Sequence, residues 1–202
     1  MQAQGGRDIS KVNGGIKVGD GETVGDVSTV NGGVKLGANA VAGAVETVNG
    51  GIKLGEGARA RSLDSVNGGV RLAERAQISG SLDSVNGSIT LLPDARVGGD
   101  LGNVNGTITL DAAHVGGLVS TTSGSVLIGA GSVVEGGLLV RKPKGWNTEN
   151  RPPRIVIGPE ADVRGTLTFE REVRLYVHDQ ARIGRIDGAT PQRYSSSEPP
   201  SD

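Results

Sequence analysis

The tetrad Val-Asn-Gly-(Gly/Ser/Thr) recurs six times along this chain of 202 residues at an almost constant spacing. The copies begin at Val12, Val30, Val48, Val66, Val85 and Val104. A unit this short cannot bury its own apolar side chains and must stack on its neighbours. The spacing therefore predicts a solenoid, whose function resides on a repetitive surface or at an end.

A second period, of six residues, lies inside each repeat. Apolar residues occur at every sixth position from Val12 to Ile78 and supply the expected interior. Three such units predict a three-sided coil of about 18 residues. Segments such as Ile16-Lys-Val18 alternate as strands do, whereas Val27-Ser-Thr-Val30 breaks the alternation and indicates a bend. The prediction is an all-β, single-stranded, three-sided parallel β-helix, in which only the corner after Ile78 accepts an extra residue.

The composition fits a narrow coil. Glycine supplies 35 residues and aromatic side chains only 2% of the chain, so the core is built from small aliphatic residues. Cysteine is absent, which excludes disulfides and thiolate metal sites. No apolar run is long enough to cross a membrane as a helix.

The Asn-Gly pair of each tetrad suits a sharp corner, because Asn tolerates and Gly freely adopts the left-handed region. Stacked coils would align the Asn side chains in a ladder in which each amide binds the next. We therefore assign a structural role to Asn13, Asn31, Asn49, Asn67, Asn86 and Asn105.

The pattern divides the chain into five parts. Residues 1–7 form a lead-in, residues 8–140 form regular coils, and residues 141–154 form a polar, proline-containing loop with Trp146. Coils resume over residues 155–188, and the composition of residues 189–202 predicts a disordered tail. Roughly nine coils fit this length, giving a rod on the order of 45 Å.

The cassette from Ala95 to Leu110, Ala-x-Val-x-Gly-x-Leu-x-x-Val-x-Gly-x-Ile-x-Leu, resembles the repeat of the bactofilins and returns in part at residues 155–167. The resemblance implies a right-handed β-helix that polymerises end to end without nucleotide. The Asn ladder and the Trp loop depart from that pattern. The Asn-Gly half is also similar to repeat domains of bacterial envelope proteins described as adhesins, which implies an exported, periplasmic relative, with the cytoplasm as the alternative.

Aromatic residues occur only beyond residue 140, and they suggest where such a polymer would join. One interpretation is that they simply close the C-terminal end of the core. The other is an end-to-end contact, for which aromatic anchors are favoured. The candidate contact residues are Phe169, Leu175 and Tyr176 at one end and Ile9, Val12 and Ile16 at the other.

Outward-facing charges recur in rows. Lys17, Lys35, Lys53 and Arg71 share one position of the repeat, and acidic residues follow three of them. At a net charge of −1 we expect a solvated mixed face and no nucleic-acid partner. An anion-binding stripe is the alternative.

No catalytic constellation is evident. His114 and His178 are the only histidines, and neither has a second ligand at metal-binding spacing, so we expect no enzyme, metal or cofactor. A left-handed hexapeptide-repeat acyltransferase is one alternative, but its coils require small residues where Ile16 and Val34 stand. An adhesin-like or polysaccharide-binding solenoid is another. The favoured expectation is a self-assembling scaffold of the bacterial cell envelope whose main partner is itself, with envelope components as further partners.

Overall fold

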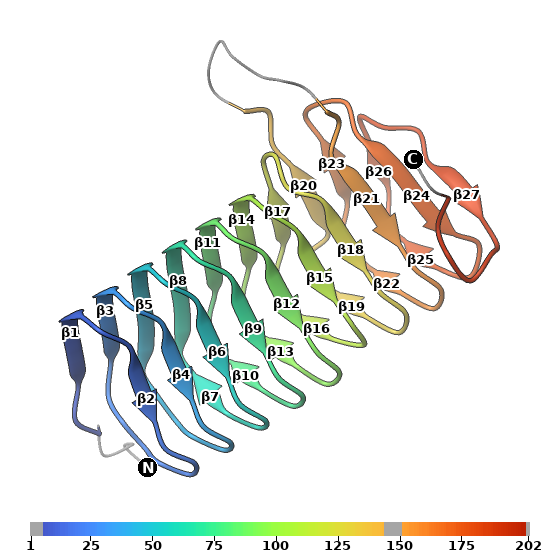
Figure 1. Cartoon of the computed structure of the whole chain (residues 1–202). Helices are drawn as coiled ribbons and strands as arrows, with labels where there is room; N and C mark the ends of the chain where they lie inside the picture. The colour runs from blue at the N-terminus through green and yellow to red at the C-terminus, as the bar shows by residue number, and fades with distance from the viewer. Residues whose placement is uncertain (1–5, 144–150, 201–202) are drawn as a thin grey trace.

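The computed structural model describes residues 6–143 and 151–200, and every regular element in them is a β-strand. The 27 strands form three parallel sheets of ten, seven and ten strands that run the length of a rod (Figure 1). Each sheet is one side of a coil that completes about nine turns. The predicted three-sided parallel β-solenoid is confirmed.

Sheet A carries the Asn tetrads. It contains β1 (Ile9–Asn13), β3 (Val27–Asn31), β5 (Ala44–Asn49), β8 (Ser62–Asn67), β11 (Leu82–Asn86), β14 (Leu101–Asn105), β17 (Val119–Thr121), β20 (Leu138–Val140), β23 (Leu167–Phe169) and β26 (Ile186–Asp187).

Sheet B follows each Asn-Gly corner. It contains β2 (Ile16–Val18), β4 (Val34–Leu36), β6 (Ile52–Leu54), β9 (Val70–Leu72), β12 (Ile89–Leu91), β15 (Ile108–Leu110), β18 (Val126–Ile128), β21 (Arg154–Ile157), β24 (Arg174–His178) and β27 (Gln192–Tyr194).

Sheet C completes the turns with two-residue strands from the third turn onward, and isolated bridges join Thr23 to Val41 and Val41 to Arg59 before it. It contains β7 (Arg59–Ala60), β10 (Gln77–Ile78), β13 (Arg96–Val97), β16 (His114–Val115), β19 (Val133–Val134), β22 (Asp162–Val163) and β25 (Arg182–Ile183).

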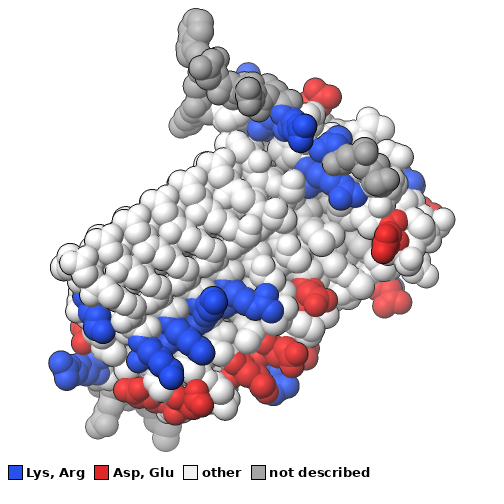
Figure 2. Space-filling view, viewed as in Figure 1, with Lys and Arg blue, Asp and Glu red and all other residues white. Residues whose placement is uncertain are grey.

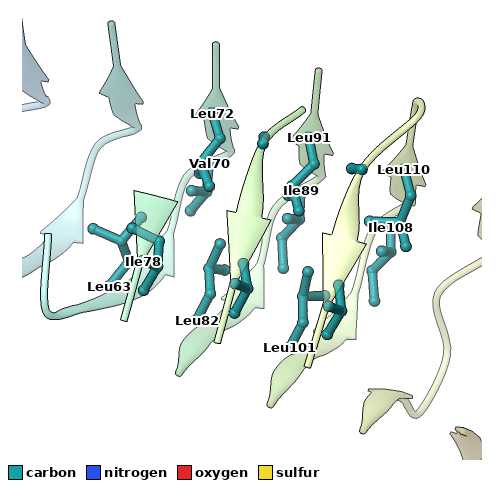
Figure 3. Close-up of a cluster of buried hydrophobic side chains, with 14 of the residues drawn as sticks. Leu63, Val70, Leu72, Ile78, Leu82, Ile89, Leu91, Leu101, Ile108 and Leu110 are labelled. Carbon is teal, nitrogen blue, oxygen red and sulfur yellow. The ribbon is translucent and has the colours of Figure 1, made fainter. Parts of the chain in front are cut away.

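Neighbouring turns stack in phase, so each residue pairs with its counterpart in the next repeat. Ile16 pairs with Val34, and Val34 pairs in turn with Ile52, each one full repeat further along the chain. The core is therefore a set of parallel columns of aliphatic side chains, part of which is drawn in Figure 3. Leu63, Leu82 and Leu101 form the column contributed by sheet A, and all three are fully buried.

Glycine permits the close stacking at the Asn-Gly corner. A Cβ added at Gly68 would collide with the backbone carbonyl of Gly50 in the preceding turn. Because the collision is with backbone, no side-chain movement can relieve it. The same collision occurs at Gly32, Gly50, Gly87 and Gly106, so the Gly after Asn is required wherever a corner packs on a preceding one.

Turn lengths vary at all three corners, so the expectation of a single permissive corner is wrong. The predicted extra residue does lie between Ile78 and Leu82. However, the corner before His114 is one residue shorter than the same corner in the preceding turn, since Leu91 pairs with Leu110 and Arg96 pairs with His114.

The longest insertion enters at the Asn-Gly corner. On sheet A Val119 pairs with Leu138, whereas on sheet B Val126 pairs with Ile155, so ten extra residues lie between β20 and β21. They enter past Asn105, the last Asn of the ladder. Trp146 lies outside the described residues.

The tetrad valines do not belong to the interior, contrary to the six-residue series. Val30 is 41% exposed, and Val48, Val66 and Val85 are each 40% exposed. In sheet A the inward positions are Val27 and Thr29, so the alternation continues across the presumed break. Hydropathy does not reveal this orientation, because Thr29, the second inward residue of the strand, is polar.

The tail prediction also needs correction. Residues 192–194 form β27, which pairs with β24 along sheet B. Tyr194 is 8% exposed, its hydroxyl donates to the Ile157 carbonyl at 3.3 Å, and its ring packs edge-on against His178 with centroids 5.0 Å apart. Strand pairing and the contacts of Tyr194 thus hold a segment whose composition predicts disorder.

Candidate functional site

The six tetrad asparagines form a continuous ladder along the corner between sheets A and B. The Nδ2 of Asn31 donates to the Oδ1 of Asn13 at 3.0 Å, and the same bond recurs in each later turn at 2.9 to 3.1 Å. The side chains are exposed, but both polar ends of the internal members are used within the ladder. This row holds neighbouring turns in register.

A second polar column, which sequence reasoning missed, lies beneath the ladder. Its buried members occupy the position before the second to sixth tetrads and the equivalent position one turn later: Thr29, Thr47, Ser65, Ser84, Asn103 and Thr121. The Thr47 hydroxyl donates to the Gly32 carbonyl at 2.9 Å, and the Asn103 amide donates to the Gly106 carbonyl at 3.2 Å. The signal was the recurrence of a hydroxyl residue at a fixed offset from the tetrad. These bonds satisfy carbonyls that the sharp corner turns away from the strand ladder.

The predicted end-contact residues lie in two different environments. Phe169 and Leu175 are 5% and 3% exposed and belong to the core, and Tyr176 is covered on the outside of sheet B by the segment that contains Tyr194. At the other end Ile16 is buried and Ile9 is partly buried, whereas Val12 is 67% exposed on the outer face. Phe169 and Tyr176 therefore lie under the last turn, and Val12 belongs to a groove along the side of the rod.

That groove runs along the outer face of sheet A and has a volume of about 500 Å³. One wall is the valine row, comprising Val12, Val30, Val48, Val66, Val85 and Val104. The opposite wall is polar, and its central part is the carboxylate row, comprising Glu46, Asp64 and Asp83. The groove extends from the first turn to Thr121 and Thr122, with Arg141 at that end.

The carboxylate row stacks like charges at strand spacing. Asp64 pairs directly with Glu46 on one side and Asp83 on the other, an arrangement that is unfavourable within a sheet. Burial raises the pKa of the Asp64 carboxyl and repulsion from Asp83 raises it further. Burial and the charge of Asp100 raise the pKa of Asp83, against the smaller effects of a hydrogen bond with Ser81 and the charge of Arg141. Among the described residues these three carboxylates form no salt bridge.

Sheet B presents the predicted cationic row. Lys17, Lys35, Lys53 and Arg71 are paired in consecutive strands. Figure 2 shows a line of Lys and Arg side chains across the first half of this face and Asp and Glu side chains gathered beside it, below the line in this view. The face is thus of mixed charge, as the sequence suggested.

The two histidines have structural surroundings. His114 Nε2 lies 3.1 Å from Glu135 Oε1, and Arg164 donates to both Glu135 and Asp162 at 2.7 and 2.9 Å, linking successive turns of sheet C. His178 is buried against Tyr194. In the described part of the chain no group of three or more acidic or histidine side chains is placed to hold a metal ion.

Residues 6–143 and 151–200 include no helix that is long and apolar enough to span a membrane. Comparisons of the chain with protein-family models, with curated proteins and with solved structures found no match.

Proposed function

We propose that this protein is a non-enzymatic scaffold that assembles end to end into filaments, as the resemblance to bactofilins implies. The observation that supports this most directly is the distribution of incompletely covered core residues. The partly buried apolar residues that pack on the core are Ile9 in the first turn and Val173, Ala181, Ile183, Ile186 and Ala189 in the last turns. Between them the core columns are buried throughout.

Backbone pairing supports the same proposal. Within the described residues β1 pairs only with β3, and β26 pairs only with β23, so each end of sheet A presents one unpaired edge. Unpaired edges are templates for strand addition. The two ends lie at opposite extremes of the rod (Figure 1). Placing β1 of one copy on β26 of another would continue sheet A at the spacing of about 4.8 Å between strands.

The burial of Phe169 changes which residues can test this contact. A charge at Phe169 would disrupt the core rather than the end surface, because the side chain is 5% exposed. Ile9 and Ile186 are suitable instead, since both are only partly buried in terminal turns. Val41, which is 36% exposed on the side of the rod, provides a matched control.

Electron microscopy of the purified protein without nucleotide tests the proposal. We expect filaments with an axial repeat of about 4.8 Å by fibre diffraction. Ile9→Asp or Ile186→Asp should prevent assembly, whereas Val41→Asp should not. Monomers at high concentration, or filaments that persist in both end variants, would contradict end-to-end stacking.

We also propose an extracytoplasmic location in a bacterium, with cell-envelope components as further partners. The support is the similarity of the Asn-Gly half to repeat domains of envelope proteins. Fractionation of cells that express the full-length gene product tests the location. Recovery only with cytoplasmic markers would contradict it.

A further inference from the structure

The groove on sheet A combines an apolar wall with an anionic wall at a constant spacing. The valine row supplies one wall, with five of its six side chains 39% to 41% exposed. Such uniform exposure of aliphatic side chains in one line is unusual for a solvated surface and is typical of a binding surface. The groove lies along the side of the rod, so end-to-end assembly would leave most of its length uncovered.

The charge of the carboxylate row determines which ligands fit the middle of the groove. The carboxylate row faces the groove across from the central valines, and none of its members has a salt bridge among the described residues. Lys11 and Arg141 lie at opposite ends of the lining. A ligand with positive charge at its centre would relieve the repulsion within the row, whereas an acidic ligand would increase it.

The spacing of the turns selects the conformation of the ligand. Two turns of the solenoid advance about 9.6 Å, at about 4.8 Å each. A polyproline II helix presents the same face every three residues, which is about 9.3 Å. A β-strand presents the same face every two residues, about 6.7 Å, and would lose phase with the wall within one turn. An extended polyproline II segment is therefore commensurate with the groove.

We propose that the sheet A groove binds a basic, proline-rich segment of a partner protein in the polyproline II conformation. Basic residues at every third position would face Glu46 and Asp83, with Asp64 between them, and proline or aliphatic residues would pack on Val48, Val66 and Val85. The lining spans six turn intervals, from the turn of Val12 to that of Thr121. This length, about 29 Å, accommodates about nine residues.

The test uses the full chain and synthetic nonapeptides labelled for fluorescence anisotropy. The peptide (Pro-Pro-Lys)₃ should bind saturably, and added salt should weaken its binding because the contacts are between exposed charges. The peptide (Pro-Pro-Glu)₃ should not bind. A third peptide of the same composition, with its lysines adjacent, should bind more weakly because it loses phase with the carboxylate row.

Two variants of the protein locate the binding. Glu46→Gln combined with Asp64→Asn and Asp83→Asn should weaken binding of (Pro-Pro-Lys)₃ roughly tenfold. The substitutions remove a like-charge repulsion, so this variant should fold at least as stably as the parent. Val66→Ser should weaken binding roughly fivefold. Lys53→Gln, on sheet B, is the matched control and should change nothing.

Three results would overturn the proposal. One is the absence of (Pro-Pro-Lys)₃ binding at concentrations up to about 1 mM. Another is equal binding by the triple carboxylate variant and by the parent. The last is binding of a glucosamine hexamer with no binding of either lysine peptide, which would assign the groove to a cationic glycan instead.

Discussion

At the residue scale, the Asn ladder stabilises the stack through bonds that each join only two turns. An internal member such as Asn49 both donates to Asn31 and accepts from Asn67, at 3.0 and 3.1 Å. Asn13, at the start of the ladder, has only the bond that it accepts from Asn31. Position in the ladder therefore sets the number of bonds that a substitution removes.

Asn49→Ala should lower the free energy of unfolding by about 1 to 2 kcal/mol, since it removes two side-chain hydrogen bonds. Asn13→Ala should cost about half as much, because it removes one. Urea denaturation followed by circular dichroism compares the two. Equal losses at both positions would show that the ladder bonds do not carry this stability.

The carboxylate row predicts an unusual dependence of stability on pH. The pKa of Asp64 and that of Asp83 are raised above the ordinary value of 3.8, so the folded state binds these protons more tightly than the unfolded state. The contribution of both groups therefore becomes more favourable as the pH falls through their raised pKa values, and it is least favourable at neutral pH.

Asp64→Asn combined with Asp83→Asn should raise the urea midpoint at pH 7 and flatten the part of the pH profile that lies above 3.8. Midpoints of the parent and the variant across this range check the prediction. A variant that is less stable than the parent at pH 7 would show that the carboxylates stabilise the fold.

At the scale of elements, strands tolerate little change in length and corners tolerate much. A residue added inside a strand moves every following side chain to the opposite face of its sheet. Corners already absorb one extra residue after Ile78 and ten between β20 and β21. The two kinds of position can be compared directly.

One Gly inserted between Ser79 and Gly80 should change the free energy of unfolding by about 1 kcal/mol or less, as a longer surface loop does. One Gly inserted between Lys53 and Leu54 should cost more than about 3 kcal/mol, because it turns the buried Leu54 outward. Chemical denaturation of both variants provides the measurement. Similar costs for the two insertions would contradict the assigned register.

The regular stacking of the turns explains which features of the fold could be predicted from the sequence. The short period and the longer repeat both follow directly from in-phase stacking, so the strands, the three sides and the Asn partners were accessible. The inward orientation of Thr29 and the exposure of Val30 were not, because hydropathy ranks the two residues in the opposite order. The ordering of residues 192–194 depends on pairing with β24 and on the contacts of Tyr194, which composition does not reveal. The groove was missed because it depends on the exposure of the valines.

At the scale of the whole molecule, stability is a sum of contacts between neighbouring turns. Central turns have a neighbour on each side, whereas the first and last turns have one. Opening should therefore begin at the ends and require the most free energy near the centre. At the C-terminal end, the segment that contains Tyr194 covers Val156 and Tyr176. This cover should raise the free energy that opening of that end requires.

Tyr194→Ala should remove about 2 kcal/mol of local stability, through lost burial and the lost hydrogen bond to Ile157. Hydrogen exchange should accelerate in β24 and β27 and stay unchanged in β8 and β9. Uniform acceleration across the chain would instead indicate that the solenoid unfolds as one cooperative unit.

The in-phase register fixes the length that each repeat adds to the molecule. Since each repeat sits on the last one with its own counterpart opposite, duplication of a repeat adds one fixed increment of about 4.8 Å and leaves the cross-section unchanged. Lengths available to such a chain are quantised, and any distance that it spans can be adjusted in a gene by copying the codons of a single repeat.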